Sequence, residues 1–237
     1  MTVAELAKRI RNRLRDTVGA DDEKFWSSEE LIDDYANQVR ADLFRIVKCL
    51  LIDSTTETDN DLLPLAVIPI VADQSLYQIS PKILQTLRFQ LASQTYPIEP
   101  RTQSELDKLV PNWRGLTSSV STPPYAYCTD YQTDSVFLVP PPYDYDTANL
   151  TNSIFPLTDL TIESPDDDLG FRSEYHKDLI PGILAVAFGK QDVETYRPDL
   201  VTRYEAEFGA RASQIMLEMY RRTRGVRANP PTSAFRS

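Results

Sequence analysis

Hydrophobic residues recur at helical spacing in two long segments, one near each end of the chain. The C-terminal segment begins at Tyr196, is opened by Pro198, and carries apolar side chains on one helical face: Leu200, Tyr204, Phe208, Ala212, Ile215 and Met219. Near the N-terminus, Ser27 and Glu30 fit a capping box ahead of a second stripe: Leu31, Tyr35, Val39, Leu43, Ile46 and Leu50. Both patterns predict core helices, and Gly225 is expected to end the later one.

Two other segments also have helical patterns. Residues 3–17 are basic and carry a narrow apolar stripe: Val3, Leu6, Ile10 and Leu14. Residues 174–192 follow a potential cap at Ser173 and are denser in apolar residues: Leu179, Ile180, Ile183, Leu184, Ala187 and Phe188. Pro181–Gly182 is expected to kink or divide this helix. The tight connection that follows predicts antiparallel packing on the final helix, and with the helix after Trp26 these would form a three-helix core.

Between these helices, apolar residues alternate with polar ones. Strand pairs are expected in three segments: residues 65–80, 83–100 and 125–142. The first pair turns at Ala72–Ser75 and the last at Asp130–Asp134, and a short helix opened by Thr102 and Glu105 lies between them. Residues 144–164 are interpreted as loop, with room for one more extended segment. The middle of the chain is therefore predicted to be a small, mostly antiparallel β region.

These elements predict an α+β fold with a helical core of three long helices, an inserted small and mostly antiparallel β region, and an extended C-terminal arm. The expected organisation has four parts: N-terminal core helices in 1–63, the β insertion in 64–165, C-terminal core helices in 166–224, and the arm in 225–237. The apolar share of 41% is enough for a sizeable core.

Charge is unevenly distributed along the chain. The formal net charge is −10, yet residues 1–15 carry +4 and residues 219–237 carry +5, which leaves about −19 on the middle. A dedicated nucleic-acid binder is expected to carry a basic face on its folded part, and this chain has the opposite distribution. Basic ends on an acidic body suit a protein whose ends contact acidic partner surfaces.

The basic C-terminal end is the predicted binding element. It has two adjacent prolines, no acidic residue and no apolar periodicity, so it is a poor helix or core strand. Its candidate partner-binding residues are Arg221, Arg222, Arg224, Arg227, Pro230, Pro231, Phe235 and Arg236. A loose chain end without a partner fits the same composition.

Catalytic and metal-binding patterns are largely missing from the sequence. There is one histidine, His176, and neither a phosphate-binding glycine pattern nor a G-x-S-x-G elbow occurs, so no cofactor, metal or enzymatic activity is expected. Cys49 and Cys128 are isolated in the sequence and are expected to be buried, reduced thiols. The acidic run Asp166–Asp168 fits either a solvated turn or a divalent-cation site. A glycoside hydrolase needs only two carboxylates across a cleft, and many pairs remain open.

Two further features have alternative interpretations. Five tyrosines cluster with prolines and fit either β-face packing or a protein contact: Tyr125, Tyr127, Tyr131, Tyr143 and Tyr145. The basic N-terminal helix fits light packing, a partner contact or a membrane surface. No apolar run is long enough for a membrane span, and the N-terminus lacks the apolar core of a secretory signal.

Several short motifs occur in an order that resembles the head-to-tail adaptor (connector) proteins of bacteriophages. The first lies in residues 26–45 and includes Trp26, Glu30, Leu31, Tyr35, Asn37 and Leu43. The central motifs comprise Leu106, Pro111, Asn112 and Trp113, and then Leu138–Pro142. The last comprise Tyr175, His176, Leu179, Tyr204 and Phe208. The resemblance spans nearly the whole chain, and the basic N-terminal helix and the acidic loop Glu57–Asp61 depart from it.

The resemblance implies a structural protein of the virion, at the head–tail junction, that is assembled in the host cytoplasm. Such adaptors form twelve-fold rings beneath the portal protein, with DNA passing through the central channel and a tail or nozzle protein below. A C-terminal extension that reaches the portal is typical of several members, and Arg221–Ser237 suits that role. Two alternatives remain open: a carboxylate-dependent hydrolase of cell-wall glycans, and a DNA-packaging accessory that uses both basic ends.

Overall fold

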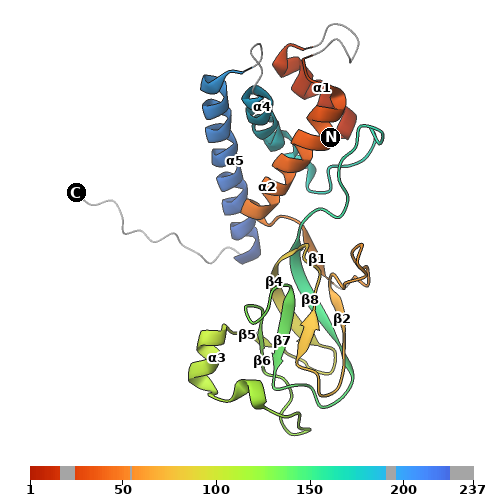
Figure 1. The fold of residues 1–237 in the computed structure, drawn as a ribbon, viewed down its shortest axis with the longest axis vertical. Helices are drawn as coiled ribbons and strands as arrows, with labels where there is room; N and C mark the ends of the chain where they lie inside the picture. The colour runs from red at the N-terminus through yellow and green to blue at the C-terminus, as the bar shows by residue number, and fades with distance from the viewer. Residues whose placement is uncertain (17–24, 54, 191–195, 225–237) are drawn as a thin grey trace, which may run out of the picture. The chain divides into compact units, whose positions relative to one another are not determined.

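The computed structural model describes residues 1–16, 25–53, 55–190 and 196–224. For residues 222–224 only the backbone is described. The chain forms two compact units. Unit 1 combines residues from Met1–Cys49 with residues from Thr158 onward, and unit 2 comprises Leu50–Leu157. Unit 1 is helical and unit 2 contains the sheets (Figure 1).

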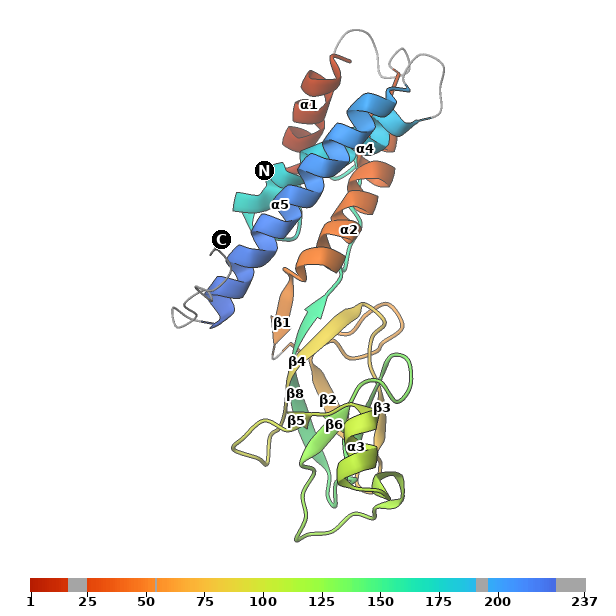
Figure 2. The same ribbon diagram turned by 90° about the vertical axis from the view of Figure 1, so that its left-hand side faces the viewer.

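The described part of unit 1 contains four α-helices that pack on one another. They are α1 (Val3–Leu14), α2 (Asn37–Val47), α4 (Leu179–Gly189) and α5 (Pro198–Arg224). A π-helical segment, Glu30–Ala36, leads into α2, and a 3-10 segment, Ser173–Asp178, leads into α4. Helix α5 packs against α4 and α2, and α1 contacts α4 (Figure 2).

Two hydrogen bonds hold the residues that precede the π-helical segment and α2. The Ser27 hydroxyl accepts the Glu30 backbone N–H at 3.0 Å, which confirms one half of the predicted capping box. The Trp26 indole N–H donates to the Ala187 carbonyl at 3.1 Å. The π-helical turn then shifts the helical face, because its hydrogen bonds span one more residue than those of an α-helix. Phe44 is therefore buried, whereas Ile46, predicted to face the core, is 44% exposed.

Helix α4 is buried along most of its length because nearly all its residues are apolar. Its start lies after Asp178, so Pro181 falls within the first turn, where a missing N–H costs no hydrogen bond. The predicted division of this segment occurs before Pro181 rather than at Pro181–Gly182. Gly182 lies at the closest approach to neighbouring helices: an added Cβ would lie 2.4 Å from Val39 Cγ1 and 3.1 Å from Phe208 Cδ2.

Side chains of the π-helical segment and of α2 also hold residues 158–169, which follow unit 2 in the chain. The Asn37 side chain donates to the Leu160 carbonyl and accepts the Leu160 N–H, both at 2.8 Å. Asp33 Oδ1 accepts the Ile162 N–H at 2.9 Å. The buried Arg40 guanidinium donates to the carbonyls of Leu169 and Thr158, and burial lowers the pKa of Arg40 to about 10.

The first sheet of unit 2 is built around β8 (Asp146–Ile154). Strand β4 (Ile83–Leu91) pairs along one edge of β8, and β1 (Leu51–Asp53) and β2 (Val67–Ile70) follow each other along the opposite edge. The second sheet has the order β3 (Leu76–Gln78), β7 (Ser135–Val139), β6 (Ala126–Cys128) and β5 (Glu99–Pro100). Within these two sheets, only the β5–β6 pairing is parallel.

Side chains from both sheets share one core, so the sheets pack face to face. This core includes Ile68, Tyr77, Phe89, Tyr127, Leu138 and Leu150. Helix α3 (Gln103–Leu109) and Trp113 cover part of the second sheet and form another cluster with Ala126, Cys128, Phe137 and Val139. Both hydrogen bonds of the capping box predicted at Thr102 and Glu105 are present.

The predicted fold class is wrong. The described residues form five α-helices and eight strands in two sheets, a mixed α/β protein rather than a core of three long helices with a small β insertion. The main error lies at residues 144–164, interpreted as mostly loop, which contain the central strand β8. Its core-facing positions alternate as Ala148, Leu150, Asn152 and Ile154, and only two of these are large apolar residues. The alternation was therefore too weak to identify the strand.

Other local predictions were better. The hairpin turning at Asp130–Asp134 is confirmed as β6 and β7, paired antiparallel. Two strands do flank Ala72–Ser75, but β2 belongs to the first sheet and β3 to the second. The turn therefore connects two sheets instead of closing a hairpin. Helix α1 ends at Leu14 because Arg15 adopts a left-handed conformation, with φ of 60°.

We expect Gly182→Ala to destabilise the protein by about 1–3 kcal/mol, because the new methyl group would overlap Val39. Gly209→Ala is the matched control: it lies in α5 with no atom within 4 Å of the added carbon, and it should stabilise the helix by about 0.5–1 kcal/mol. Urea unfolding followed by circular dichroism measures both. Equal effects of the two substitutions would contradict the close helix contact.

We expect Asn37→Ala to lower stability by about 1–3 kcal/mol, since two hydrogen bonds to Leu160 are lost. Amide hydrogen exchange should become faster at Leu160 and its neighbours. Gln38→Ala provides the control, because the Gln38 side chain is exposed, and its effect should stay within about 0.5 kcal/mol. Unchanged exchange at Leu160 in Asn37→Ala would show that this anchor is dispensable.

Candidate interaction surfaces

Helix α5 brings basic residues to its C-terminal end. Pro198 is its first residue, as predicted, and Ala212 and Ile215 are buried on its inner face. The helix is anchored midway by Arg211, which contacts Asp178 Oδ1 at 2.9 Å and Glu207 Oε1 at 2.6 Å. Burial alone would lower the pKa of Arg211, but these two hydrogen bonds raise it above its usual value.

The predicted partner-binding residues lie partly in this helix. Arg221 is exposed, and Arg222 and Arg224 belong to the last turn of α5. The helix C-terminus carries partial negative charge, so cations are favourable there. The other predicted residues lie outside the described part of the chain: Arg227, Pro230, Pro231, Phe235 and Arg236. Their role in binding therefore stays a prediction.

The same end of α5 also exposes apolar side chains. Met216, Leu217 and Tyr220 are 44%, 52% and 47% exposed. The sequence analysis missed them because they lie off the apolar stripe that packs on α4. Apolar residues on the outward side of a surface helix are the signal that identifies them. They add apolar contact area beside Arg221.

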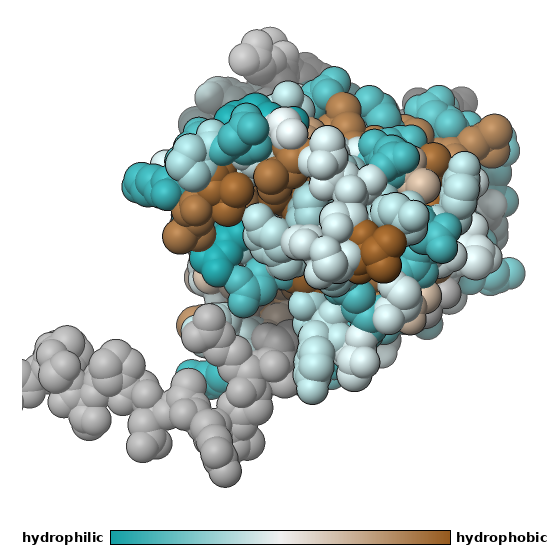
Figure 3. All heavy atoms as spheres, turned by 90° about the horizontal axis from the view of Figure 1, so that it is seen from below, coloured by the Kyte–Doolittle hydropathy of each residue, from teal (hydrophilic) through white to brown (hydrophobic). Residues whose placement is uncertain are grey.

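A second candidate surface is a groove at one end of unit 2. Its volume is about 360 Å³, and it lies between the turn after β4, the loop before β6 and the β7–β8 connection. Apolar and aromatic residues supply much of its lining: Leu91, Val120, Pro123, Pro124, Pro142, Tyr143 and Tyr145. Figure 3 shows this end of unit 2, where apolar patches are interspersed with polar residues.

Hydrogen bonds made by the Gln94 and Asp146 side chains hold the three segments of this groove together. The Gln94 amide donates to the Pro124 carbonyl at 3.0 Å and thereby joins the first two segments. Asp146 accepts the backbone N–H and the hydroxyl of Ser93, at 3.2 and 2.5 Å, and thereby joins the first and third. The groove is therefore framed by fixed loops rather than by isolated side chains.

The tyrosines singled out in the sequence are separated by the fold. Tyr127 is buried in the core between the sheets, and burial raises its pKa. Tyr131 packs on Trp113 and Phe137 at the other sheet face. Tyr143 and Tyr145 are 56% and 73% exposed and line the groove. The β-face packing interpretation therefore holds for Tyr127 and Tyr131, and a protein contact stays a prediction for the exposed tyrosines.

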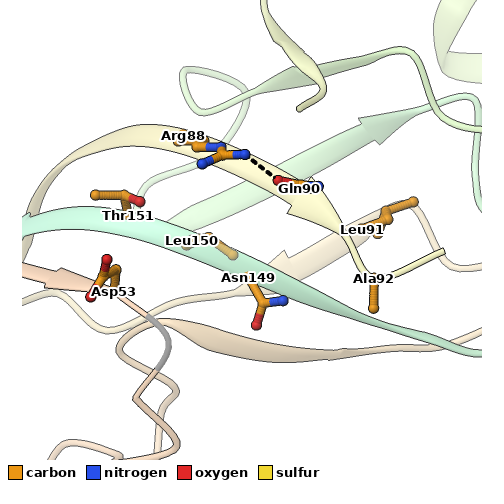
Figure 4. Close-up of a pocket in the computed structure, with 8 residues that line it drawn as sticks. All are labelled: Asp53, Arg88, Gln90, Leu91, Ala92, Asn149, Leu150 and Thr151. Atoms are coloured by element: carbon orange, nitrogen blue, oxygen red, sulfur yellow. Dashed lines mark hydrogen bonds between the residues drawn. The ribbon is translucent and has the colours of Figure 1, made fainter. Parts of the chain in front are cut away.

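The face of the first sheet carries a polar hollow of about 380 Å³ (Figure 4). Arg88 and Gln90 of β4 are hydrogen-bonded to each other, and Asn149 and Thr151 lie on the neighbouring strand β8. Asp53 of β1 is the one carboxylate among the residues that line it. A pair of carboxylates for hydrolysis is therefore missing from this hollow.

A third hollow, of about 260 Å³, lies between α5 and the 3-10 segment of unit 1. It contains three carboxylates, and each has a partner. Glu174 lies 3.7 Å from Arg172, Asp178 is bound by Arg211, and Glu218 accepts the Tyr175 hydroxyl at 3.3 Å. The contacts of Asp178 and Glu218 hold α5 in place, and the arrangement gives no support to an acid–base pair.

The single histidine is part of the packing of unit 1. His176 is buried, its Nε2 lies 2.6 Å from the Phe171 carbonyl oxygen, and Asp168 Oδ1 is 3.7 Å away. Asp168 belongs to the acidic run considered as a cation site. Among the described residues, no group of three or more histidine, cysteine, aspartate or glutamate side chains is arranged to hold a metal ion.

The two cysteines are free thiols. Burial, together with the Asp130 carboxylate 2.7 Å away, raises the pKa of Cys128 to about 12. Burial also raises the pKa of Cys49 to about 11. Both sulfurs are therefore thiols at neutral pH, which makes them poor nucleophiles.

None of the helices in the described segments combines the length and the apolar character that crossing a membrane requires.

Comparison with known families identifies the chain. The family model for the SU10 adaptor protein matches residues 1–232, nearly the full length of the sequence. No curated protein matches the chain. The matched range includes both units and the motifs on which the resemblance to phage adaptors was based, so that resemblance is confirmed. The chain belongs to the SU10 adaptor protein family.

Proposed function

We propose that this protein is a structural head-to-tail adaptor of a bacteriophage virion, which forms a twelve-fold ring beneath the portal and joins it to the tail. The observation that carries the proposal is the family match over residues 1–232. Subunits of a ring need heterologous contacts on their sides as well as contacts above and below. A chain with two compact units and several exposed apolar surfaces is suited to making contacts of more than one kind.

The basic end of the chain is the proposed portal-binding element. It starts at Arg221, Arg222 and Arg224 in α5 and continues through the residues outside the described part of the chain. Guanidinium groups bind carboxylates with two parallel hydrogen bonds, so arginine favours acidic partner surfaces. The exposed side chains Met216, Leu217 and Tyr220 add apolar area next to these charges.

The proposal assigns no catalysis to this protein. Membership of an adaptor family supports a structural role. The hydrolase alternative gains no support from the hollow on the first sheet, which has a single carboxylate, or from the hollow beside α5, where the carboxylates are already paired. The cysteine thiols are held protonated at neutral pH.

DNA is proposed to pass through the centre of the ring without being held. The chain has a net charge of −10, and its basic residues are concentrated near its ends. An acidic wall repels the phosphate backbone, so packaged DNA would not adhere to it during ejection. The proposed location is therefore the head–tail junction of the virion, with portal and tail proteins as partners.

We expect deletion of residues 225–237 to abolish association with the portal while leaving the fold intact, because the arginine contacts are removed. Co-purification with the cognate portal protein measures binding, and circular dichroism measures folding. Wild-type stoichiometry in the truncated complex would show that the arm is not the portal contact.

Point variants test whether individual arginines make the portal contact. Replacing Arg227 and Arg236 together by glutamine should weaken portal binding, and replacing them by lysine should restore only part of it, since lysine lacks the bidentate geometry. The control is Arg203→Gln, which removes an exposed arginine near the N-terminal end of α5 and should leave portal binding unchanged.

We expect the purified protein to be monomeric on its own and to form a ring only on the portal. Acidic bodies repel one another, and the proposed contact through the C-terminal arginines requires the portal to be present. Sedimentation velocity with and without portal measures this difference. A stable twelve-mer without portal would contradict the requirement for a template.

A further inference from the structure

The groove at the end of unit 2 has no role in the portal contact proposed above. Tyr143 and Tyr145 come from the β7–β8 connection, and Val120 comes from the loop before β6. Val120 and Tyr145 are each 73% exposed. Large apolar side chains exposed together around a concavity are typical of an interaction site.

The lining of this groove favours an extended, proline-containing peptide. Tyr143, Tyr145 and Pro123 present flat, rigid surfaces of the kind that bind polyproline II segments. Such segments keep their shape before binding, so little conformational entropy is lost. The loops around the groove are tied to each other by hydrogen bonds through Gln94 and Asp146, so the site is also formed in advance.

The charges of the groove favour an arginine in that peptide. Asp144 and Asp146 line it, and no lysine or arginine does. Neither carboxylate forms a salt bridge within the described part of the chain. A guanidinium group can pair with Asp144 and also stack on the tyrosine rings. The chemistry of the groove therefore specifies a cationic occupant with prolines.

We propose that this groove binds an extended, proline-containing and arginine-bearing segment of the tail-side protein. The inference rests on the adaptor function and names the chemistry of its second partner. The portal contact proposed above uses the C-terminal arm, which leaves the groove for a different protein. The arm itself contains Pro230, Pro231 and Arg227, so it is the natural competitor that an experiment has to exclude.

Peptide binding tests the chemistry of the site. The probe is a fluorescent peptide of about ten residues in a proline-rich polyproline II sequence with arginines, mixed with the full-length protein. Binding should weaken as salt is added. Tyr145→Ala and Asp144→Asn should each reduce affinity about tenfold, whereas Tyr96→Ala, which removes a 79% exposed tyrosine outside the groove lining, should not.

Two outcomes of this assay would overturn the proposal. One is the absence of binding, or equal binding by all variants. The other is tighter binding of a peptide comprising residues 225–237 than of the proline-rich probe, which would make the chain's own end the occupant. Asp146 is left unchanged in these variants because it bonds to Ser93, and thermal unfolding should show the same stability for all of them.

Particle assembly tests the source of the peptide. A phage that lacks its own copy of this gene is complemented with the chain carrying both Asp144→Asn and Tyr145→Ala. We expect heads with portal and adaptor but without tails. Normal tail attachment, or loss of the variant from the portal, would overturn the assignment of the groove to the tail. If the wild-type chain itself fails to bind portal, the adaptor function fails instead, independently of the peptide result.

Discussion

Strand β8 is the element on which unit 2 depends. It pairs with β4 along one edge and with β1 and β2 along the other, so every strand of the first sheet is hydrogen-bonded to it. Its pairing with β1 also brings the start of unit 2 beside its end, where the Ile154 N–H donates to the Leu50 carbonyl at 3.0 Å. This pairing closes a loop of more than a hundred residues at its base, which lets a whole β unit be inserted in the sequence of the helical unit.

In unit 1 the corresponding constraint is the burial of α4. This helix is apolar around most of its circumference, so it must be covered on several sides, and α1, α2 and α5 provide that cover. Gly182 allows α2 and α5 to approach closely because it has no side chain there. The outer side of α5 is then left for other contacts, including its exposed apolar residues and the basic end.

The proposed functions divide between the two units in a physically reasonable way. Unit 1 carries arginines at the C-terminal end of α5, suited to the acidic surface of a partner. Unit 2 carries carboxylates and tyrosines in a groove framed in advance, suited to a cationic peptide. Opposite charge requirements at the two surfaces would keep the partners from exchanging places.

The sequence determined the elements whose signals are local. Capping at Thr102 and Glu105 identified α3, the turn at Asp130–Asp134 identified a hairpin, and ordered motifs identified the adaptor family. Only the tertiary structure decided the rest. The alternation of apolar and polar residues in β8 is weak, so the sequence did not identify it as the central strand. Its central position depends on pairing with three other strands. The groove of unit 2 was likewise beyond sequence reasoning, because it joins segments as distant as Gln94, Pro124 and Tyr145, and spacing along the chain does not record which loops meet in space.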